Sequence, residues 1–378
     1  MNVKRFKLMD KYFLATLVTI LVFGMVILSS ASAGISSDPY LYLKKQGAFL
    51  ILGIVFAFLL IRFDYTQLEK YSPYLYGLAL VTLIVVLIFG SEVRGTTGWI
   101  GIGGLPPVQP AEFTKIILIL TFADFLSRRK GELNTFAQLL PCLVYMGIPF
   151  ILIMMQPDLG TALVYVVITV GMMYIAGANP SLLTKLIIGS VLAIALVVFL
   201  HFRFNMWLPL DDYQFKRLSV FVNPYQDGQG GRGAGWNTIQ SLIAIGAGGF
   251  KGTGLYLGTQ VQLNFLPERH TDFIFAVIGE EFGFMGAAFL IVLYGFLLAR
   301  ALVICNNSRE LYGTLIVAGI TAMWLFHIFE NIGMCIGLMP ITGIPLPFVS
   351  YGGSSMLTNM VGVGLILSVN IRGKKIVF

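Results

Sequence analysis

Three acidic side chains lie in one long apolar stretch in the last third of the chain. The stretch HTDFIFAVIGEEFGFMGAAFLIVLYGFLLA begins at His270, has Asp272 near its start and carries Glu280 and Glu281 further along. A carboxyl group inside a membrane segment costs roughly 2.5–3.5 kcal/mol, so each needs a partner or a function. Because a carboxylate can accept a proton from a substrate hydroxyl, Asp272 is the first candidate for catalysis.

Glu280 and Glu281 have a different expected role. In a single helix running from Asp272 they would lie roughly 12–14 Å deeper in the membrane. We expect them to be structural, bonded to neighbouring helices, and Lys115 is a candidate partner. Asp272 would instead lie where a membrane-bound substrate meets water.

Polar residues also occur at the ends of other apolar runs. Glu112 and Lys115 are three residues apart in QPAEFTKIILIL, which places them on one helix face, either as an internal ion pair or as the lining of a polar cavity. Asp158 in QPDLGTAL either caps a helix N-terminus or belongs to the same cavity. His327 and Glu330 share a helix face and predict an internal polar contact.

The glycine-rich segments between apolar runs contain arginine and tryptophan. Arg94 and Trp99 belong to VRGTTGWIGIGG, Arg217 to QFKRLSVF, and Arg269 lies close to Asp272. Guanidinium groups fit phosphate oxygens, and a flat indole fits the face of a sugar. One such loop usually is a flexible connection, but several beside one acid favour a site for a phosphorylated sugar.

Composition assigns the chain to the integral membrane proteins. Of its 378 residues, 57% are hydrophobic and 11% charged, and the mean hydropathy is +0.84. The net charge of +7 is typical of cytoplasmic loops, so nucleic acid is not an expected partner. The sequence has no ATP-binding GxxxxGK[ST] motif and no HExxH or paired CxxC motif, so neither ATP-driven transport nor a bound structural zinc is expected.

Apolar runs of about 20 residues predict the membrane spans. Ten are expected in one membrane domain over residues 1–378, the first being an uncleaved helix rather than a signal peptide: 12–33, 46–63, 74–90, 112–127, 138–155, 158–177, 181–201, 272–299, 311–336 and 353–371. The fold class is therefore an all-α polytopic membrane protein.

Lysine and arginine in the short loops set the expected orientation. They concentrate on the side that holds both chain ends, for example in the RRK loop at 128–130 and the RGKK segment at 372–375. Both termini are therefore predicted to be cytoplasmic. The long segment 202–271, between the seventh and eighth spans, is then extracytoplasmic.

Five stretches together resemble the SEDS family (shape, elongation, division and sporulation). They are RGTTGWI, QPAEFTK, QPDLGTAL, LGTQVQLNFLPERHTDFIFAVIGEEFGF and GIPLPFVSYGGSSM, and they extend over nearly the whole chain in the family's order. The GTQ tripeptide and the short tails favour the RodA branch over the FtsW branch. The resemblance implies ten spans with both ends inside, in agreement with the charge pattern.

The resemblance also implies an activity. SEDS proteins are peptidoglycan glycosyltransferases that polymerise lipid II outside the bacterial cell membrane, together with a class B penicillin-binding protein and other elongation-complex membrane proteins. The family's essential aspartate corresponds to Asp272. Substrate contacts are expected from residues of the matching stretches and the outer loops: Arg94, Trp99, Glu112, Lys115, Asp158, Arg217, Arg269, His270, Thr271 and Ser350. No cofactor is assigned, although a divalent cation, Mg²⁺ or Mn²⁺, could share the neutralisation of pyrophosphate charge.

Two other classes of function remain open from the residues alone. A transporter or flippase for the lipid-linked precursor would also need a polar cavity with buried acids. A non-catalytic scaffold for a penicillin-binding protein would need neither the cavity nor Asp272.

Overall fold

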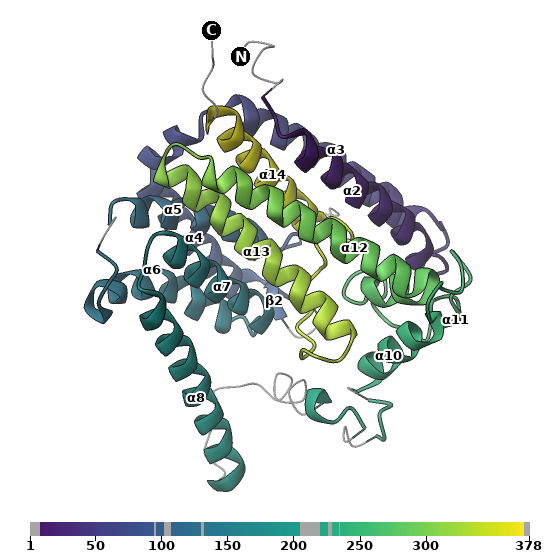
Figure 1. Cartoon of the computed structure of the whole chain (residues 1–378). Coiled ribbons are helices and arrows are strands. Elements are labelled where there is room, and N and C mark those ends of the chain that lie inside the picture. The colour runs from purple at the N-terminus through teal and green to yellow at the C-terminus, as the bar shows by residue number, and fades with distance from the viewer. Residues whose placement is uncertain are drawn as a thin grey trace.

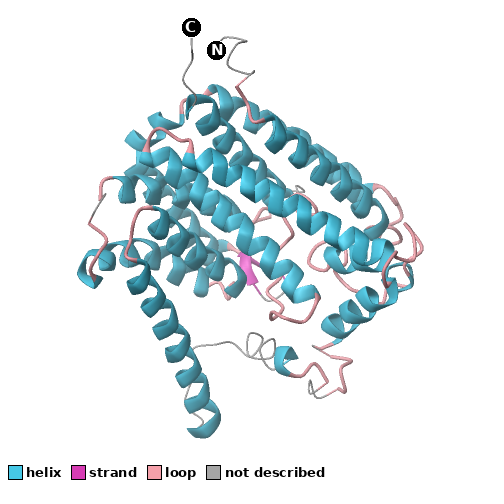
Figure 2. Cartoon of the chain, in the orientation of Figure 1, coloured by secondary structure: helices cyan, strands magenta, loops and turns pink. Residues whose placement is uncertain are grey.

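Long apolar helices make up most of the protein. The computed structural model describes residues 8–93, 96–101, 107–129, 132–204, 220–225, 229–233 and 235–373, and helix dominates this part (Figure 2). The long helices are α2 (Lys11–Ala31), α3 (Leu41–Arg62), α4 (Ser72–Phe89), α5 (Pro110–Ser127), α6 (Phe136–Met154), α7 (Leu159–Ile175), α8 (Pro180–Phe204), α12 (Ile274–Asn306), α13 (Leu311–Cys335) and α14 (Gly353–Gly373). Each coincides with one predicted span.

Shorter elements connect the long helices. They are a 3-10 helix η1 (Tyr65–Tyr71), the hairpin strands β1 (Ser91–Val93) and β2 (Thr96–Trp99), and the helices α10 (Trp236–Gly248) and α11 (Thr259–Gln262). Eight helices of the described chain are long and apolar enough to cross a membrane. α7 is shorter and α5 carries Glu112, Lys115 and Asp124, but both pack against the central helix α13.

Burial differs strongly between central and peripheral helices. Of the spanning window, 83% is buried in α14 and 72% in α13, but only 6% in α8, which projects from the body in Figure 1. Many exposed large side chains of α3, α4 and α8 are apolar, for example Ile54, Leu78 and Leu192. Such a surface suits lipid chains, because in a membrane apolar side chains are stable on the outside.

Basic residues gather where several helices end. Arg372 at the end of α14 donates to the carbonyl of Phe63 (2.7 Å), and Arg309 donates to that of Gly373 (3.2 Å). Arg300 of α12 pairs with Asp10, just before α2. The start of α2 and the end of α14 therefore share one side of the molecule (Figure 1), as the charge pattern predicted.

A break divides α12 and corrects the expectation of a single straight helix. Gly283 has φ 62° and ψ −160°, a conformation that is essentially restricted to glycine. The helix begins at Ile274, so Asp272 precedes it, and Glu280 and Glu281 lie just before the break rather than deep in a continuous span. The outer part, residues 274–282, is almost entirely buried, whereas exposed apolar residues begin at Phe284.

The loop after α10 fills this break. Phe284 N donates to the carbonyl of Gly249 (2.9 Å), while Thr253 N and Gly254 N donate to those of Glu280 (3.0 Å) and Glu281 (2.9 Å). These bonds satisfy backbone groups that a broken helix leaves without partners, which is a strict requirement near a membrane. The described part of the outer segment is thus a packed support for α12.

Candidate active site

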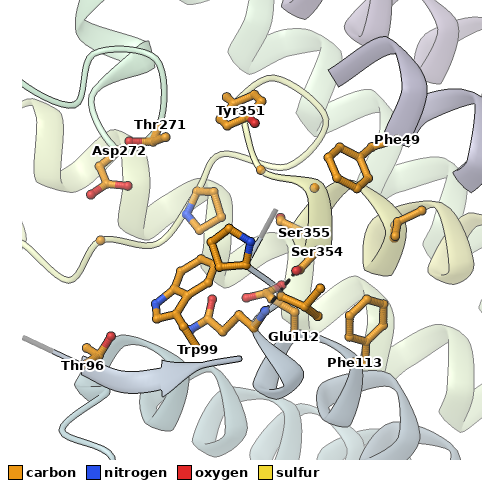
Figure 3. Close-up of a pocket in the computed structure, with 18 of the residues that line it drawn as sticks. Phe49, Thr96, Trp99, Glu112, Phe113, Thr271, Asp272, Tyr351, Ser354 and Ser355 are labelled. Carbon is orange, nitrogen blue, oxygen red and sulfur yellow. Dashed lines mark hydrogen bonds between the residues drawn. The ribbon is translucent and has the colours of Figure 1, made fainter. Parts of the chain in front are cut away.

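A cavity of about 350 Å³ lies among helix ends on the side opposite the basic helix ends described above. Figure 3 shows Trp99 from the β-hairpin, Glu112 and Phe113 from α5, Phe49 from α3, and Asp272 from the loop before α12 around it. The start of α14 and the segment before it also line it. These walls come from distant parts of the sequence: Tyr42, Phe49, Thr96, Trp99, Pro107, Val108, Gln109, Glu112, Phe113, Asp158, His270, Thr271, Asp272, Thr342, Gly343, Pro345, Tyr351, Gly352, Gly353, Ser354, Ser355 and Leu357.

Six of the residues predicted to form the site line this cavity. They are Trp99, Glu112, Asp158, His270, Thr271 and Asp272. Lys115, Arg269 and Ser350 do not line it, and Arg94 and Arg217 lie outside the described residues. Sequence reasoning therefore found the three acids of the lining and Trp99, but not Tyr42, Phe49, Phe113 or Tyr351. Of the four predicted cationic contacts, Lys115 and Arg269 lie outside the lining, and Arg94 and Arg217 stay predictions.

Polar and apolar side chains both line the cavity. Asp272 and Thr271 lie at one side in Figure 3, and Phe49 and Phe113 lie at the other. Leu357 adds to the apolar lining. The cavity can therefore accept a molecule that has a polar and an apolar part.

Glu112 and Lys115 form the predicted ion pair. Lys115 Nζ lies 2.6 Å from Glu112 Oε1 and 3.3 Å from His327 Nε2, and the Lys115 side chain is only 1% exposed. Glu112 reaches the cavity while Lys115 lies behind it. Both predicted roles thus apply, the ion pair to both residues and the cavity lining to Glu112.

Asp158 caps α7 and lines the cavity at the same time. Its Oδ1 accepts from Thr161 N at 2.9 Å, and its Oδ2 accepts from Gln109 Nε2 at 3.0 Å. The Gln109 bond joins the starts of α5 and α7 beneath the cavity. Gln109 was missed from the sequence because a lone glutamine before a helix gives no spacing signal.

Arg269 has a structural contact in place of the predicted phosphate contact. Its guanidinium donates to the carbonyls of Ala31 (2.9 Å) and Ala33 (2.7 Å), at the C-terminal end of α2. A cation is favourable there because the last carbonyls of a helix lack partners. Burial lowers the pKa of Arg269.

Ser350 also has a role other than the predicted substrate contact. Its hydroxyl donates to the carbonyl of Thr271 at 2.6 Å and accepts from Leu346 N at 2.8 Å. Ser350 therefore holds the loop before α12 that carries Thr271 and Asp272.

The acids of the outer α12 segment do not reach Lys115, contrary to the expectation. Glu280 accepts from Gln260 N at 2.8 Å and from Val261 N at 3.3 Å, at the start of α11. Glu281 accepts from the hydroxyl of Ser30 in α2. The structural role of both acids is supported, with these partners instead of Lys115. Glu330 likewise has an internal partner, the hydroxyl of Thr342 at 2.6 Å.

Aromatic rings form part of the polar wall. The ring centroids of Tyr42 and His270 are 4.7 Å apart, and those of Tyr42 and Tyr351 are 5.0 Å apart. Burial raises the pKa of Tyr351, and the nearby Tyr42 is a second, smaller cause of the same shift. The phenol is therefore neutral over the physiological range and available for hydrogen bonding.

The described residues offer little support for a bound cation. No group of three or more His, Cys, Asp or Glu side chains in these ranges could hold a metal ion. A divalent cation, Mg²⁺ or Mn²⁺, stays a prediction, because such an ion can be held by one or two carboxylates together with substrate phosphates.

A family model described as cell cycle protein, covering FtsW, RodA and SpoVE, matches residues 10–375. The chain belongs to this family. It is 36% identical to a probable peptidoglycan glycosyltransferase FtsW of Trichlorobacter lovleyi, over 96% of this chain and 93% of that protein. It is 32% identical to the peptidoglycan glycosyltransferase RodA of Treponema pallidum, over 96% of this chain and 98% of that protein.

A solved structure has the same fold. A chain from a study of how a peptidoglycan synthase complex coordinates polymerization and crosslinking superposes with a TM-score of 0.78, at 30% identity, covering 97% of this chain and 98% of that one. The predicted SEDS membership, the all-helical polytopic membrane fold and the peptidoglycan glycosyltransferase class of the family are confirmed.

Proposed function

We propose that this cavity polymerises lipid II into glycan strands, with Asp272 as the general base. The observation that carries the proposal is the position of Asp272 in the wall of a cavity that is lined by both polar and apolar side chains. Lipid II has both parts, a disaccharide-peptide and a polyprenyl chain, joined by pyrophosphate. Its reacting bond lies just above the membrane surface.

The reaction is a displacement at the anomeric carbon of one muramyl sugar. Asp272 accepts the proton of the 4-hydroxyl on a second lipid II as that oxygen bonds to the carbon. The bond from carbon to pyrophosphate breaks, and the pyrophosphate lipid leaves with the electron pair. An α-linked donor thus gives a β-linked product in one inverting step, which requires a base and no covalent intermediate.

The leaving pyrophosphate is negatively charged, and the described lining is acidic, so cationic groups must neutralise the developing charge. Glu112, Asp158 and Asp272 are in it, and no lysine or arginine of the described residues is. Arg94 is five residues before Trp99, which lines the cavity. We assign neutralisation to Arg94 and Arg217, while Trp99 and the nearby aromatic rings pack on sugar.

The active site is proposed to face the outside of the cell membrane. α14 carries Gly353 at the cavity and Arg372 at its opposite end, among the other basic helix ends. Because basic loops favour the cytoplasm, the cavity belongs to the extracytoplasmic side.

We place the chain in the elongation branch and propose a class B penicillin-binding protein as its partner. The GTQ tripeptide supports the branch. Overall identity does not decide it, because FtsW and RodA relatives are similarly identical to this chain. The related peptidoglycan synthase complex, in which polymerization and crosslinking are coordinated, supports the partner.

The decisive experiment measures glycan polymer formed from labelled lipid II by the purified protein with its partner. Asp272→Asn is compared with wild type and with Asp38→Asn, a control on an exposed carboxylate that pairs with Lys44. We expect polymer from wild type and from the control, and a rate about 10²–10⁴ lower from Asp272→Asn. Equal polymer from all three would remove Asp272 from the chemistry.

The same assay separates the two other classes of function. A flippase would move lipid II across vesicles and form no polymer even with wild type. A scaffold would keep partner binding and partner activity in Asp272→Asn. Loss of polymer together with intact partner binding supports the enzyme.

A further inference from the structure

The loop that carries Asp272 is held through its backbone. Three consecutive carbonyls, those of residues 270–272, each accept a hydrogen bond from the chain between α13 and α14 or from α13 itself. Tyr351 N donates to His270 at 2.9 Å, and the Ser350 hydroxyl donates to Thr271 at 2.6 Å. The third donor is the Asn331 amide, at 2.7 Å from the carbonyl oxygen of Asp272 itself.

Asn331 is the shorter-range of two side-chain donors to the Asp272 carbonyl, the other being the Cys335 thiol at 3.8 Å. Its Nδ2 also donates to the carbonyl of Ile344 at 2.8 Å, so one amide group ties Asp272 to the segment behind the cavity. The side chain is fully buried at 0% exposure. Because both neighbours are carbonyl oxygens, only the nitrogen of the amide can face them, which fixes its orientation.

We propose that Asn331 is a positioning residue for glycosyl transfer, acting through Asp272. An aspartate has only two side-chain torsions, so fixing its peptide group largely fixes where the carboxylate can reach. The second hydrogen bond, from Asn331 to the Ile344 carbonyl, also holds the neighbouring Gly343 in place. Gly343 lies beside the Asp272 carboxylate: a Cβ added to it would be 3.5 Å from Asp272 Oδ2. Asn331 thereby sets both the backbone of the base and the wall beside its carboxylate.

Positioning can change a rate greatly while leaving substrate binding intact. A displacement of about 1 Å at a reacting group can cost roughly 10²-fold. Asn331 does not line the cavity, so it does not contact substrate. This inference rests on the proposed role of Asp272, and its test must therefore include Asp272 variants.

The test measures kcat and KM for lipid II polymerisation with the chain and its partner. Asn331→Ala removes both bonds, and Asn370→Ala is the matched control. Asn370 is also buried, but its side chain accepts from Asp10 N at 3.0 Å, at the basic end of the molecule. We expect kcat to fall about 10-fold to 100-fold in Asn331→Ala with KM within about two-fold of wild type. The control should keep both constants.

A double variant tests whether the effect passes through Asp272. If it does, Asp272→Asn combined with Asn331→Ala is no slower than Asp272→Asn alone, because the base is already gone. A full additional loss in the double variant, or a wild-type kcat in Asn331→Ala, would overturn the inference while the base assignment stands. A fully active Asp272→Asn would overturn both.

A second substitution covers the case in which Asn331→Ala does not fold. Asn331→Asp preserves the size and shape of the side chain but can donate at most one hydrogen where the amide donates two. It should show the same kcat loss and the same non-additivity with Asp272→Asn. Wild-type kcat in a folded Asn331→Asp would count against the proposal in the same way.

Discussion

The two parts of α12 on either side of Gly283 share one apolar sequence but have opposite surroundings. The outer part contains Glu280 and Glu281, both almost fully buried, and connects directly to Asp272. The inner part is long and presents Phe284, Met285 and Val292 at its surface. The outer part is thus a fixed support for the site, and the inner part is an ordinary lipid-facing span. Substitutions in the two parts should therefore differ in kind.

The largest effect is expected at the end of the outer part, from Asp272→Glu. The charge is kept, but the carboxylate is moved by one methylene from its wild-type position beside Gly343. A base that works by position should lose about 10²-fold in kcat, with thermal unfolding unchanged. If Asp272→Glu polymerises lipid II at the wild-type rate, Asp272 contributes by charge alone.

The next largest effect is expected at the break, from Gly283→Val. An added Cβ would lie 2.4 Å from Gly252 N, and the φ of 62° is unfavourable for any other residue. The backbone conformation alone costs about 1–3 kcal/mol, and the clash adds to it. We expect a lower midpoint of thermal unfolding and reduced polymerisation.

Gly295→Val is the control for this prediction. Gly295 lies in the inner part, and nothing is within 4 Å of an added Cβ. Its unfolding midpoint should stay close to that of wild type. If the two variants are equally destabilised, the break has no special structural importance.

How far the sequence could predict this contrast depends on what each signal contains. Hydropathy located the long helices of the described chain, because lipid requires apolar runs. The charge pattern predicted that the start of α2 and the end of α14 lie on the same side of the membrane. The break was missed because glycines also occur at 279 and 286 in the same run, and none reveals its φ.

The polar contacts of the site divide in the same way. The ion pair of Glu112 and Lys115 was predictable because its spacing is local. The partners of Glu280 and Arg269 were not, since they come from distant segments, and a lone Asn331 in an apolar helix carries no pattern. Motif resemblance identified Asp272, but only the folded chain shows what holds it.

A moderate effect is expected from Glu280→Gln in the outer part. The carboxylate accepts from the backbone N–H groups of Gln260 and Val261, and hydrogen bonds to a charged group contribute about 1.5–3 kcal/mol. The side-chain NH₂ of a glutamine at this position would face at least one of these two backbone N–H groups, so that a donor would meet a donor. The free energy of unfolding should fall by about 1–3 kcal/mol, measured by thermal unfolding in detergent. Glu310→Gln, on an exposed side chain, should have no measurable effect.

The smallest effect is expected from Val292→Ala in the inner part. Val292 is 67% exposed, and in a membrane its side chain contacts lipid, which is as apolar as the protein interior. Truncation therefore creates no cavity and loses little, within about 0.5 kcal/mol. Val277→Ala is the matched substitution in the outer part, where the side chain is 0% exposed and a cavity would form. Thermal unfolding of the two variants compares the two parts directly. Equal losses would mean that the inner part is also enclosed by protein, for instance by a partner's helix.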